Sequence, residues 1–559
     1  MNEQALCHIP ESKYCFAVDS HTVKLRLRLD KNDIPDSVQV VYGGKYEFAT
    51  IQHTAEMLRC YVDRLYAYYE TALKLDDLRL TYVFRICNKG KIQYFSEDGL
   101  TDSYDFELNY FNCFQYAFIN ECDVHSPIDW MKNAVFYQIF VERFRIGNTS
   151  KDMSYVNLHW GDLPNSKSFA GGDLKGIEEK LDYIKSLGVN ALYLTPIFTS
   201  HSNHKYDIID YFKVDPHFGT NDDLICLIEA AHSKGIKVVL DAVFNHCSED
   251  SYEFQDVRKN GKKSLYYDWF IIKNDEPFSY ECFASCDYMP KFNTSNLEVQ
   301  EYLIDIALHW LKYYNVDGWR LDVSDEVSHE FWRKFRMAIK DIDKDCVLIG
   351  ENWHDANVYL QGDQFDSIMN YAFTKACLDF YAFDNFDVYQ FADKLNEILM
   401  RNTDAVNIMM LNLLDSHDTH RFLTRAKSED KLLSAIALLF FFVGTPCIYY
   451  GTENAMQGNY DPDSRRTFDW EMEDKQTAEK SLIRFLAKIK SSGELNGADT
   501  KIYAKDGLLH IERNGLRLTI NGEQSRPYAA VALYYNGFDG RNLAANGFVI
   551  EIIVKEETK

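Results

Sequence analysis

The stretch Gly318-Trp319-Arg320-Leu321-Asp322-Val323 decides the fold that we expect for this chain. It reads as an apolar strand that ends on an aspartate, with an arginine two residues earlier. Because side chains two residues apart on a strand face the same side, Arg320 and Asp322 are predicted to lie next to each other. Two further strand-like runs end on carboxylates, since Leu348-Ile349-Gly350 leads to Glu351 and Leu414-Asp415-Ser416-His417 leads to Asp418.

Eight such strand-like runs alternate with helical patterns after about residue 130. The strands are expected at 134–140, 191–197, 238–244, 317–323, 347–352, 367–370, 408–414 and 447–450. Helical periodicity lies between them, for example at 176–187 and 297–314. Eight strand-then-helix units predict an α/β fold, a (β/α)8 TIM barrel, whose active site lies at the C-terminal ends of the strands.

The segments on either side of the barrel have the short alternating pattern of β domains. Residues 1–125 predict an N-terminal β-sandwich, because runs such as 23–29 alternate strictly between apolar and charged residues. The catalytic barrel is then expected at 126–476, with an inserted subdomain at about 247–290. A small C-terminal all-β domain is expected at 477–559.

Net charge, apolar stretches and cysteine spacing indicate which binding partners and which cellular compartment to expect. The net charge of −25 repels phosphate backbones, so nucleic-acid binding is not expected. The longest apolar stretch, 435–443, is too short to span a bilayer, and no secretory signal is visible at the N-terminus. The 13 cysteines are scattered without metal-type pairing, which predicts free thiols in a cytoplasmic protein.

Three carboxylates at successive strand ends are what the cleavage of a glycosidic bond requires. Arg320 is expected to lower the pKa of Asp322, which suits a nucleophile. A largely dry pocket is expected to raise the pKa of Glu351 towards about 6, which suits an acid. An aspartate at a strand end is more often a helix cap, and a lone histidine is more often a core residue. The conjunction of an Asp/Arg pair, a Glu and the His417-Asp418 pair favours catalysis.

These segments resemble the conserved regions of the α-amylase superfamily, glycoside hydrolase family 13, over most of the chain. The resemblance implies Asp322 as the nucleophile, Glu351 as the general acid/base and Asp418 as the carboxylate that stabilises the transition state. It also implies that His246, Arg320 and His417 bind the sugar at the scissile bond, whereas Asp241 and Asn245 organise their strand and loop.

A narrower resemblance is to the neopullulanase, cyclomaltodextrinase and maltogenic amylase subfamily. It rests on Met289-Pro290-Lys291-Phe292-Asn293, on the stretches at 203–207 and 326–332, and on Tyr449-Tyr450-Gly451. The resemblance implies a homodimer formed through the N-terminal domain. It also implies further sugar-binding residues: Tyr206 before the cleaved bond, Trp353 on the acceptor side, and Asp461 and Arg465 towards the non-reducing end.

The sequence departs from the family pattern at several positions. Asp325, Thr452 and Phe292 each replace the usual residue, and a further departure concerns metal binding. In many relatives a loop after the first barrel strand binds calcium, and its counterpart here is 146–152. Calcium needs six to eight oxygens, and Lys151 brings a positive charge instead. We therefore expect no metal and no cofactor, with the lysine ammonium in place of the ion.

The function expected is a retaining hydrolase of α-1,4 and some α-1,6 glucosidic bonds in cyclodextrins, maltooligosaccharides and pullulan, with transglycosylation favoured by Trp353. Two alternatives stay open: another enzyme of the superfamily, such as an oligo-1,6-glucosidase or an endo-α-amylase, and a non-catalytic binding protein. The N-terminal domain could bind glycans through Tyr42 and Tyr46, or form the dimer interface, which we favour.

Overall fold

The computed structural model describes residues 1–553, and the N-terminal part of the chain forms two antiparallel sheets. One sheet has the order β1 (Cys15–Asp19), β2 (Thr22–Asp30), β6 (Tyr66–Lys74), β5 (Leu58–Val62). The other has the order β4 (His53–Glu56), β3 (Ser37–Gly44), β7 (Leu80–Asn88), β8 (Lys91–Ser96), β9 (Gly99–Thr101), with β10 (Phe114–Tyr116) paired to β7.

Strand β2 shows how this domain is joined to the rest of the molecule. Val23, Leu25 and Leu27 are fully buried on the face that packs into the sandwich core. The opposite face carries Arg26, whose guanidinium lies 2.6 Å from Glu70 and 3.4 Å from Asp404 at the barrel. Because side chains alternate between the two faces of a strand, β2 has one face in the sandwich core and one polar face that contacts the barrel.

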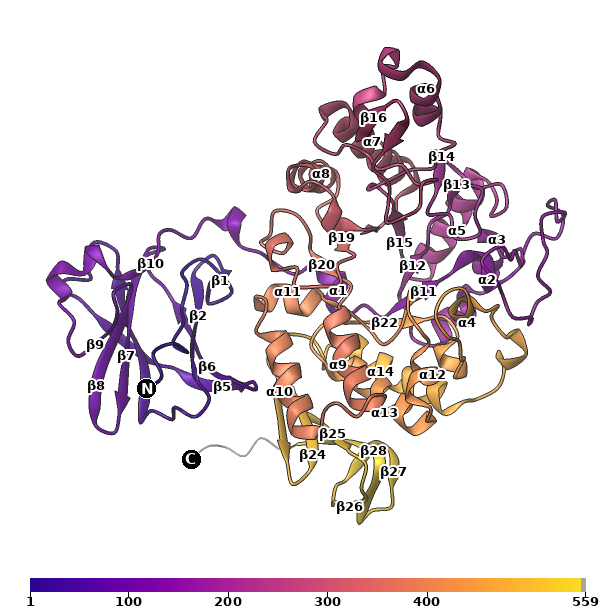
Figure 1. Ribbon diagram of the computed structural model, residues 1–559. Helices are drawn as coiled ribbons and strands as arrows, with labels where there is room; N and C mark the ends of the chain where they lie inside the picture. The colour runs from indigo at the N-terminus through magenta and orange to yellow at the C-terminus, as the bar shows by residue number, and fades with distance from the viewer. Residues whose placement is uncertain (554–559) are drawn as a thin grey trace.

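The middle of the chain forms an eight-stranded parallel barrel, surrounded by helices in Figure 1. The strands are β11 (Phe136–Ile139), β12 (Ala191–Leu194), β15 (Lys237–Ala242), β18 (Gly318–Leu321), β19 (Val347–Gly350), β20 (Ser367–Ile368), β21 (Leu411–Leu413) and β22 (Thr445–Tyr449). They pair in the order β20-β19-β18-β15-β12-β11-β22-β21, and a parallel bridge between Met369 and Leu411 joins the two ends of this row. The predicted fold class is confirmed.

Helices cover the outside of the barrel and continue beyond its last strand. Their bounds are α1 (Asp129–Lys132), α2 (Val141–Phe144), α3 (Leu174–Glu179), α4 (Leu181–Ser186), α5 (Asn221–Ser233), α7 (Leu297–Tyr314), α8 (His329–Ile342), α9 (Tyr371–Tyr381), α10 (Val388–Leu399), α11 (Asp404–Met409), α12 (Phe422–Ala426), α13 (Glu429–Phe441) and α14 (Ala478–Ser491).

Two expected elements differ in detail. The helix expected at 176–187 is split into α3 and α4 at Lys180, whose backbone leaves the helical region (φ −107°, ψ 10°). The strand expected from residue 408 begins only at Leu411, because α11 runs through Met409. Apolar residues of the buried end of a helix and of a buried strand look alike in sequence, and this accounts for the second error.

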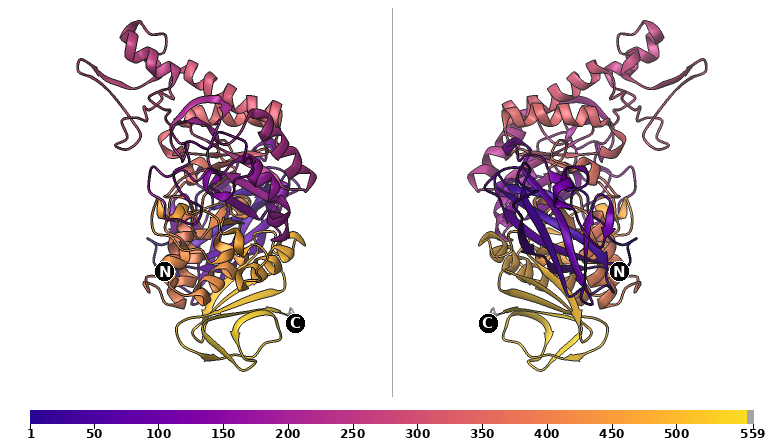
Figure 2. Two further views of the ribbon diagram at one scale, coloured as in Figure 1. Left: turned by 90° about the vertical axis from the view of Figure 1, so that its right-hand side faces the viewer. Right: turned by 90° about the vertical axis from the view of Figure 1, so that its left-hand side faces the viewer.

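Two excursions from the barrel rise above its strands. The hairpin β13 (Phe198–Ser200) and β14 (Ile208–Val214) follows β12. Between β15 and β18 the chain forms α6 (Tyr252–Asn260), β16 (Ile272–Asp275) and β17 (Phe278–Tyr280). Figure 2 shows this second excursion projecting from the body of the molecule. These elements lie within residues 247–290, and the bounds of an inserted subdomain there stay a prediction.

The C-terminal sheet has the order β23 (Lys501–Lys505), β24 (Leu508–Arg513), β25 (Leu516–Asn521), β28 (Asn542–Ile552), β26 (Arg526–Pro527), with β27 (Ala532–Phe538) paired to β28. The last six residues of the expected domain, 554–559, lie outside the described part. The boundaries at residues 125 and 476 stay predictions. Within residues 1–553, no helix is both long and apolar enough to cross a membrane.

Candidate active site

Four carboxylates meet around one guanidinium at the C-terminal ends of the barrel strands. Arg320, on β18, places its Nη1 atom 3.0 Å from Asp241 and 2.7 Å from Asp322. Its Nη2 atom lies 2.8 Å from Glu351 and 3.9 Å from Asp418. All three residues proposed for catalysis are therefore gathered at one point, together with Asp241 from β15.

The backbone after β18 is shaped to hold this cluster. Val323 has a left-handed conformation, with φ 44° and ψ 45°. That conformation is costly for a β-branched residue and is typically held in place by its surroundings at a functional site. Here it directs the Val323 amide to donate a 3.0 Å hydrogen bond to Glu351 Oε2. The turn thus fixes Glu351 directly beside Asp322.

An aromatic wall lies on the other side of the cluster. Tyr206 comes from the β13–β14 loop, and its ring lies parallel to that of His417 at 5.5 Å between centroids. The Tyr206 hydroxyl donates a 3.0 Å hydrogen bond to Asp241 Oδ2. Gln138 donates to His417 Nδ1 at 2.7 Å, which leaves His417 Nε2 to carry the hydrogen and face Asp418 at 3.1 Å.

Asp418 also contacts Arg465, which in turn pairs with Asp461. Arg465 lies 3.3 Å from Asp418 and 2.9 Å from Asp461, so one guanidinium links the cluster to the segment 459–466. The side chains of Asp418 and Asp461 are 25% and 38% exposed, whereas Arg465 is buried. This chain of charges extends from the carboxylate cluster towards solvent, and its carboxylates can accept hydrogen bonds from sugar hydroxyls.

The opposite side of the cluster is formed by Trp353 and Tyr371. The Trp353 indole donates a 3.1 Å hydrogen bond to Glu351 Oε1. Its ring stacks on Tyr371, with 3.7 Å between centroids and an angle of 4°. Trp353 is 45% exposed, so one face of the indole stays open next to Glu351. An open aromatic face beside an acid is a platform for a sugar ring.

His246 lies in the loop after β15, beneath the inserted subdomain. Asn245 contacts its Nδ1 at 3.2 Å, and Phe283 from the insertion stacks on its ring at 4.9 Å. Among residues 1–553, its buried Nε2 has no hydrogen-bond partner. Burial lowers the pKa of His246 to about 3, so the ring is neutral and able to bind a hydroxyl group.

The protonation expected for Asp322 is corrected by this geometry. Burial raises the pKa of Asp322 well above its ordinary value, Arg320 opposes this, and the neighbouring carboxylates add to it. Burial likewise raises the pKa of Asp241 to about 6. The sequence argument weighed one aspartate against one arginine. In the structure Asp322 is buried and shares Arg320 with Asp241 and Glu351, so burial and the neighbouring carboxylates outweigh the arginine and raise the pKa of Asp322.

The loop corresponding to a calcium site in many relatives holds a lysine ammonium. Lys151 Nζ lies 2.9 Å from Asp173 Oδ2 and donates 2.7 Å hydrogen bonds to the carbonyl oxygens of Gly171 and His217. Asp173 also caps α3 by accepting from the Gly176 amide. These contacts are those expected of an ammonium in place of a cation. The absence of calcium itself stays a prediction.

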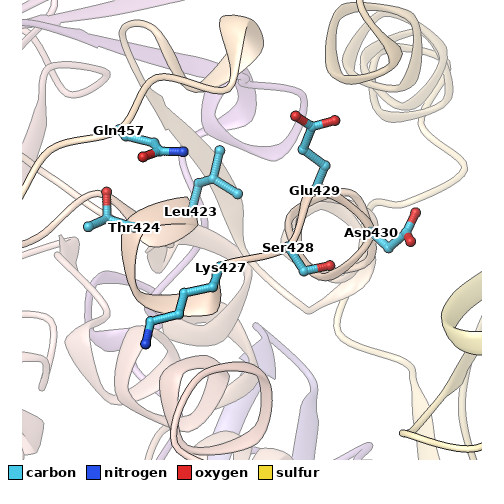
Figure 3. Close-up of a pocket in the computed structure, with 7 residues that line it drawn as sticks. All are labelled: Leu423, Thr424, Lys427, Ser428, Glu429, Asp430 and Gln457. Atoms are coloured by element: carbon cyan, nitrogen blue, oxygen red, sulfur yellow. The ribbon is translucent and has the colours of Figure 1, made fainter.

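Sequence reasoning missed Tyr371 and Phe283. Tyr371 is the first residue of α9, and Phe283 lies in an irregular part of the insertion, so neither belongs to a strand-end pattern. The pocket shown in Figure 3, of about 540 Å³, lies beside α12 and the start of α13. Its lining includes none of the residues of the carboxylate cluster, so it is separate from the candidate active site.

The barrel and the carboxylates at its strand ends define an enzyme of the glycoside hydrolase class. The family model "Alpha amylase, catalytic domain" matches residues 138–495, and "Alpha amylase, N-terminal ig-like domain" matches 1–120. The chain therefore belongs to the α-amylase family.

Relatives and solved structures agree with this assignment. A cyclomaltodextrinase of Thermoanaerobacter pseudethanolicus is 44% identical, covering 88% of this chain and 85% of that protein. Neopullulanase 2 of Thermoactinomyces vulgaris is 40% identical, covering 87% and 85%. A solved structure of a cyclomaltodextrinase has a TM-score of 0.89 and 35% identity, covering 98% of this chain and 99% of that one. The resemblance to the subfamily is confirmed.

Proposed function

We propose that the chain is a retaining α-glucan hydrolase in which Asp322 attacks the anomeric carbon while Glu351 protonates the leaving oxygen. Water activated by Glu351 then releases the glucosyl-enzyme. The observation that supports this most directly is the shared guanidinium, since Asp322 and Glu351 each bind one terminal nitrogen of Arg320. Retention requires carboxyl groups about 5–5.5 Å apart, and carboxylates on one arginine fork lie close together.

The other residues of the site have supporting roles in this proposal. Asp418 accepts hydrogen bonds from hydroxyls of the distorted sugar, held in place by Arg465. His246 and His417 are buried and neutral, so they bind hydroxyls without adding charge. Tyr206 supplies the stacking surface on one side of the cleaved bond, and Trp353 supplies it on the other.

The preferred substrates that we propose are cyclodextrins, short maltooligosaccharides and pullulan. The names of the relatives support this choice. The test is to digest β-cyclodextrin, pullulan and soluble starch in parallel. Fast opening of the cyclodextrin, panose from pullulan and slow cleavage of starch would support the proposal. Fast starch cleavage with untouched cyclodextrin would indicate an endo-α-amylase instead, and α-1,6 cleavage alone an oligo-1,6-glucosidase.

A non-catalytic binding role is disfavoured by the same site. Such a protein has no need to keep the nucleophile, the acid and the third carboxylate together, yet Asp322, Glu351 and Asp418 all lie around Arg320. Hydrolysis of a chromogenic maltoside that is lost in Asp322→Asn would separate the two readings. Unchanged slow hydrolysis in that variant would favour the binding role.

We further propose that the protein is a cytoplasmic homodimer formed through the N-terminal domain. Exposed aromatic residues on this domain support an interface, since Tyr46, Tyr110 and Phe111 are 80%, 64% and 73% exposed. A relative from Bacillus subtilis named intracellular maltogenic amylase, 39% identical, supports the location. Size-exclusion chromatography of Phe111→Ser should show a monomer with unchanged affinity for pullulan. A stable dimer with weakened pullulan binding would instead indicate a glycan-binding role.

A further inference from the structure

A pocket of about 550 Å³ lies between the N-terminal domain and the barrel, directly beside the acceptor-side aromatic pair. Trp353 and Tyr371, the two rings next to Glu351, form part of its lining. Its lining also includes Lys13 and Arg28 from the N-terminal domain and Arg401 from the turn that follows α10. None of the clustered carboxylates lines this pocket, but it shares Trp353 with the site, since the Trp353 indole donates a 3.1 Å hydrogen bond to Glu351.

The charge of this pocket is opposite to that of the molecule as a whole. Its lining has five basic side chains against two carboxylates, although the chain carries a net charge of −25. The basic residues are Lys13, Arg28, Lys375, Lys394 and Arg401. Both Lys394 and Arg401 pair with one carboxylate, Glu397, at 2.8 Å.

Among the residues that the structure describes, Lys13 and Arg28 lack an ionic partner. Within residues 1–553, no carboxylate oxygen lies within 4.0 Å of either side chain's charged nitrogens. Arg28 donates to the carbonyl oxygen of Ala5 at 3.1 Å and lies 4.0 Å above the Tyr66 ring. Burial lowers the pKa of Lys13, Asp355 opposes this, and Arg26, Arg401 and Arg28 add to it. Mutually repelling cations in a half-buried pocket are a site that an anion would stabilise.

We propose that this pocket binds the phosphate group of a phosphorylated hexose whose sugar ring lies against Trp353. The proposal rests on the proposed function, because it assigns an acceptor to the same active site. Guanidinium and ammonium groups are the usual partners of phosphate oxygens, and an open indole face is a partner for a sugar ring. Because Trp353 both lines the pocket and donates a hydrogen bond to Glu351, we assign a sugar phosphate rather than a polymeric anion.

A bound sugar phosphate would be positioned to replace water in the second step. Its hydroxyl oxygen attacks the anomeric carbon of the glucosyl group on Asp322, and Glu351 takes the hydroxyl proton. The ester bond to Asp322 breaks and returns its carboxylate, while a new glycosidic bond forms. The phosphate monoester is unchanged, so the product is an oligosaccharide with a phosphate on its reducing-end sugar.

Isothermal titration calorimetry tests the site without turnover, using glucose 6-phosphate, glucose and inorganic phosphate as probes. Wild type should bind glucose 6-phosphate at least about tenfold more tightly than glucose, as expected from charge-assisted hydrogen bonds. Lys13→Met should remove most of that advantage. Lys91→Met makes the same change at a 59% exposed lysine on β8 and should keep it. The advantage should shrink with added salt.

The outcomes separate the parts of the proposal. Equal binding of glucose 6-phosphate and glucose, or an unchanged advantage in Lys13→Met, would overturn the phosphate site. Inorganic phosphate that binds as tightly as glucose 6-phosphate would overturn the sugar part. Mass spectrometry of β-cyclodextrin digests with glucose 6-phosphate should show phosphorylated oligosaccharides, and their absence would overturn the acceptor role. Failure to digest cyclodextrin, with intact calorimetric binding, would instead contradict the proposed function alone.

Discussion

Replacement of Lys151 by methionine should destabilise the barrel by leaving a carboxylate buried without its cation. Lys151 and Asp173 are 8% and 1% exposed and lie 2.9 Å apart. Breaking a buried pair by removing one partner costs about 3–5 kcal/mol. Asp173 keeps hydrogen bonds from the amides of Gly147, Asn148 and Gly176 at 2.9, 3.0 and 2.7 Å. Because these three amides still bind Asp173 in the variant, the expected loss of unfolding free energy is near the lower end of that range, at about 3 kcal/mol.

The cost is expected to come from the orphaned aspartate rather than from the loss of a stabilising pair. Burial lowers the pKa of Lys151 even though Asp173 opposes this, so the ammonium is not stabilised overall relative to water. The double variant Lys151→Met, Asp173→Asn should therefore regain a large part of the loss, because an amide oxygen can still cap α3. This recovery distinguishes charge burial from a simple packing defect.

Thermal unfolding at a fixed scan rate measures the effect. A loss of about 3 kcal/mol should lower Tm by roughly 4 °C, because an unfolding entropy of about 2.1 cal/mol/K per residue is summed over the roughly 350 residues of the barrel. Lys175→Met serves as the control, since Lys175 is 45% exposed and pairs only with Glu178. Wild type should show the same Tm in chelator and in millimolar calcium. A Lys151→Met variant as stable as the control, or a Tm of wild type that falls in chelator, would refute the reasoning.

Three further predictions concern catalysis and pH. Asp322→Asn should lower kcat by at least about 10³-fold with unchanged circular dichroism, and activity within tenfold of wild type would exclude Asp322 as the nucleophile. Trp353→Ala should lower the ratio of transfer to hydrolysis products at high maltotriose, measured by chromatography; an unchanged ratio would remove Trp353 from acceptor binding. Burial lowers the pKa of His8 to about 4. Neutral His8 is therefore favoured in the folded state. The contribution of His8 to the free energy of unfolding is full above pH 6.5 and is lost as the pH falls towards 4. This contributes about 2 kcal/mol between pH 7 and 5. In urea unfolding, His8→Phe should lose less unfolding free energy between pH 7 and 5 than wild type does. If both proteins show the same dependence of unfolding free energy on pH, the assignment to His8 is contradicted.

The fold was largely predictable because its signals are local. Each barrel strand is a short apolar run, and the order of strands and helices along the chain determines the order of the sheet. The residues that end these runs, such as Asp322 and Glu351, then fall at one end of the barrel by geometry alone. Contacts between distant segments were not predictable in this way. Trp353 was named, but its stacking partner Tyr371 begins a helix, and no sequence period links the two.

The protonation of the site is the clearest case where local reasoning fails. From sequence, Arg320 and Asp322 form an isolated pair, and the arginine should keep the aspartate ionised. In the structure Asp322 is buried, and Asp241 and Glu351 contact the same guanidinium, so Arg320 does not offset the cost of ionising Asp322. The pKa values of Asp241 and Asp322 are both raised by burial, so these two carboxyls titrate together and a retained proton belongs to the pair rather than to one residue. In the proposed first step Asp322 must be ionised, so a proton retained by this pair has to reside on Asp241.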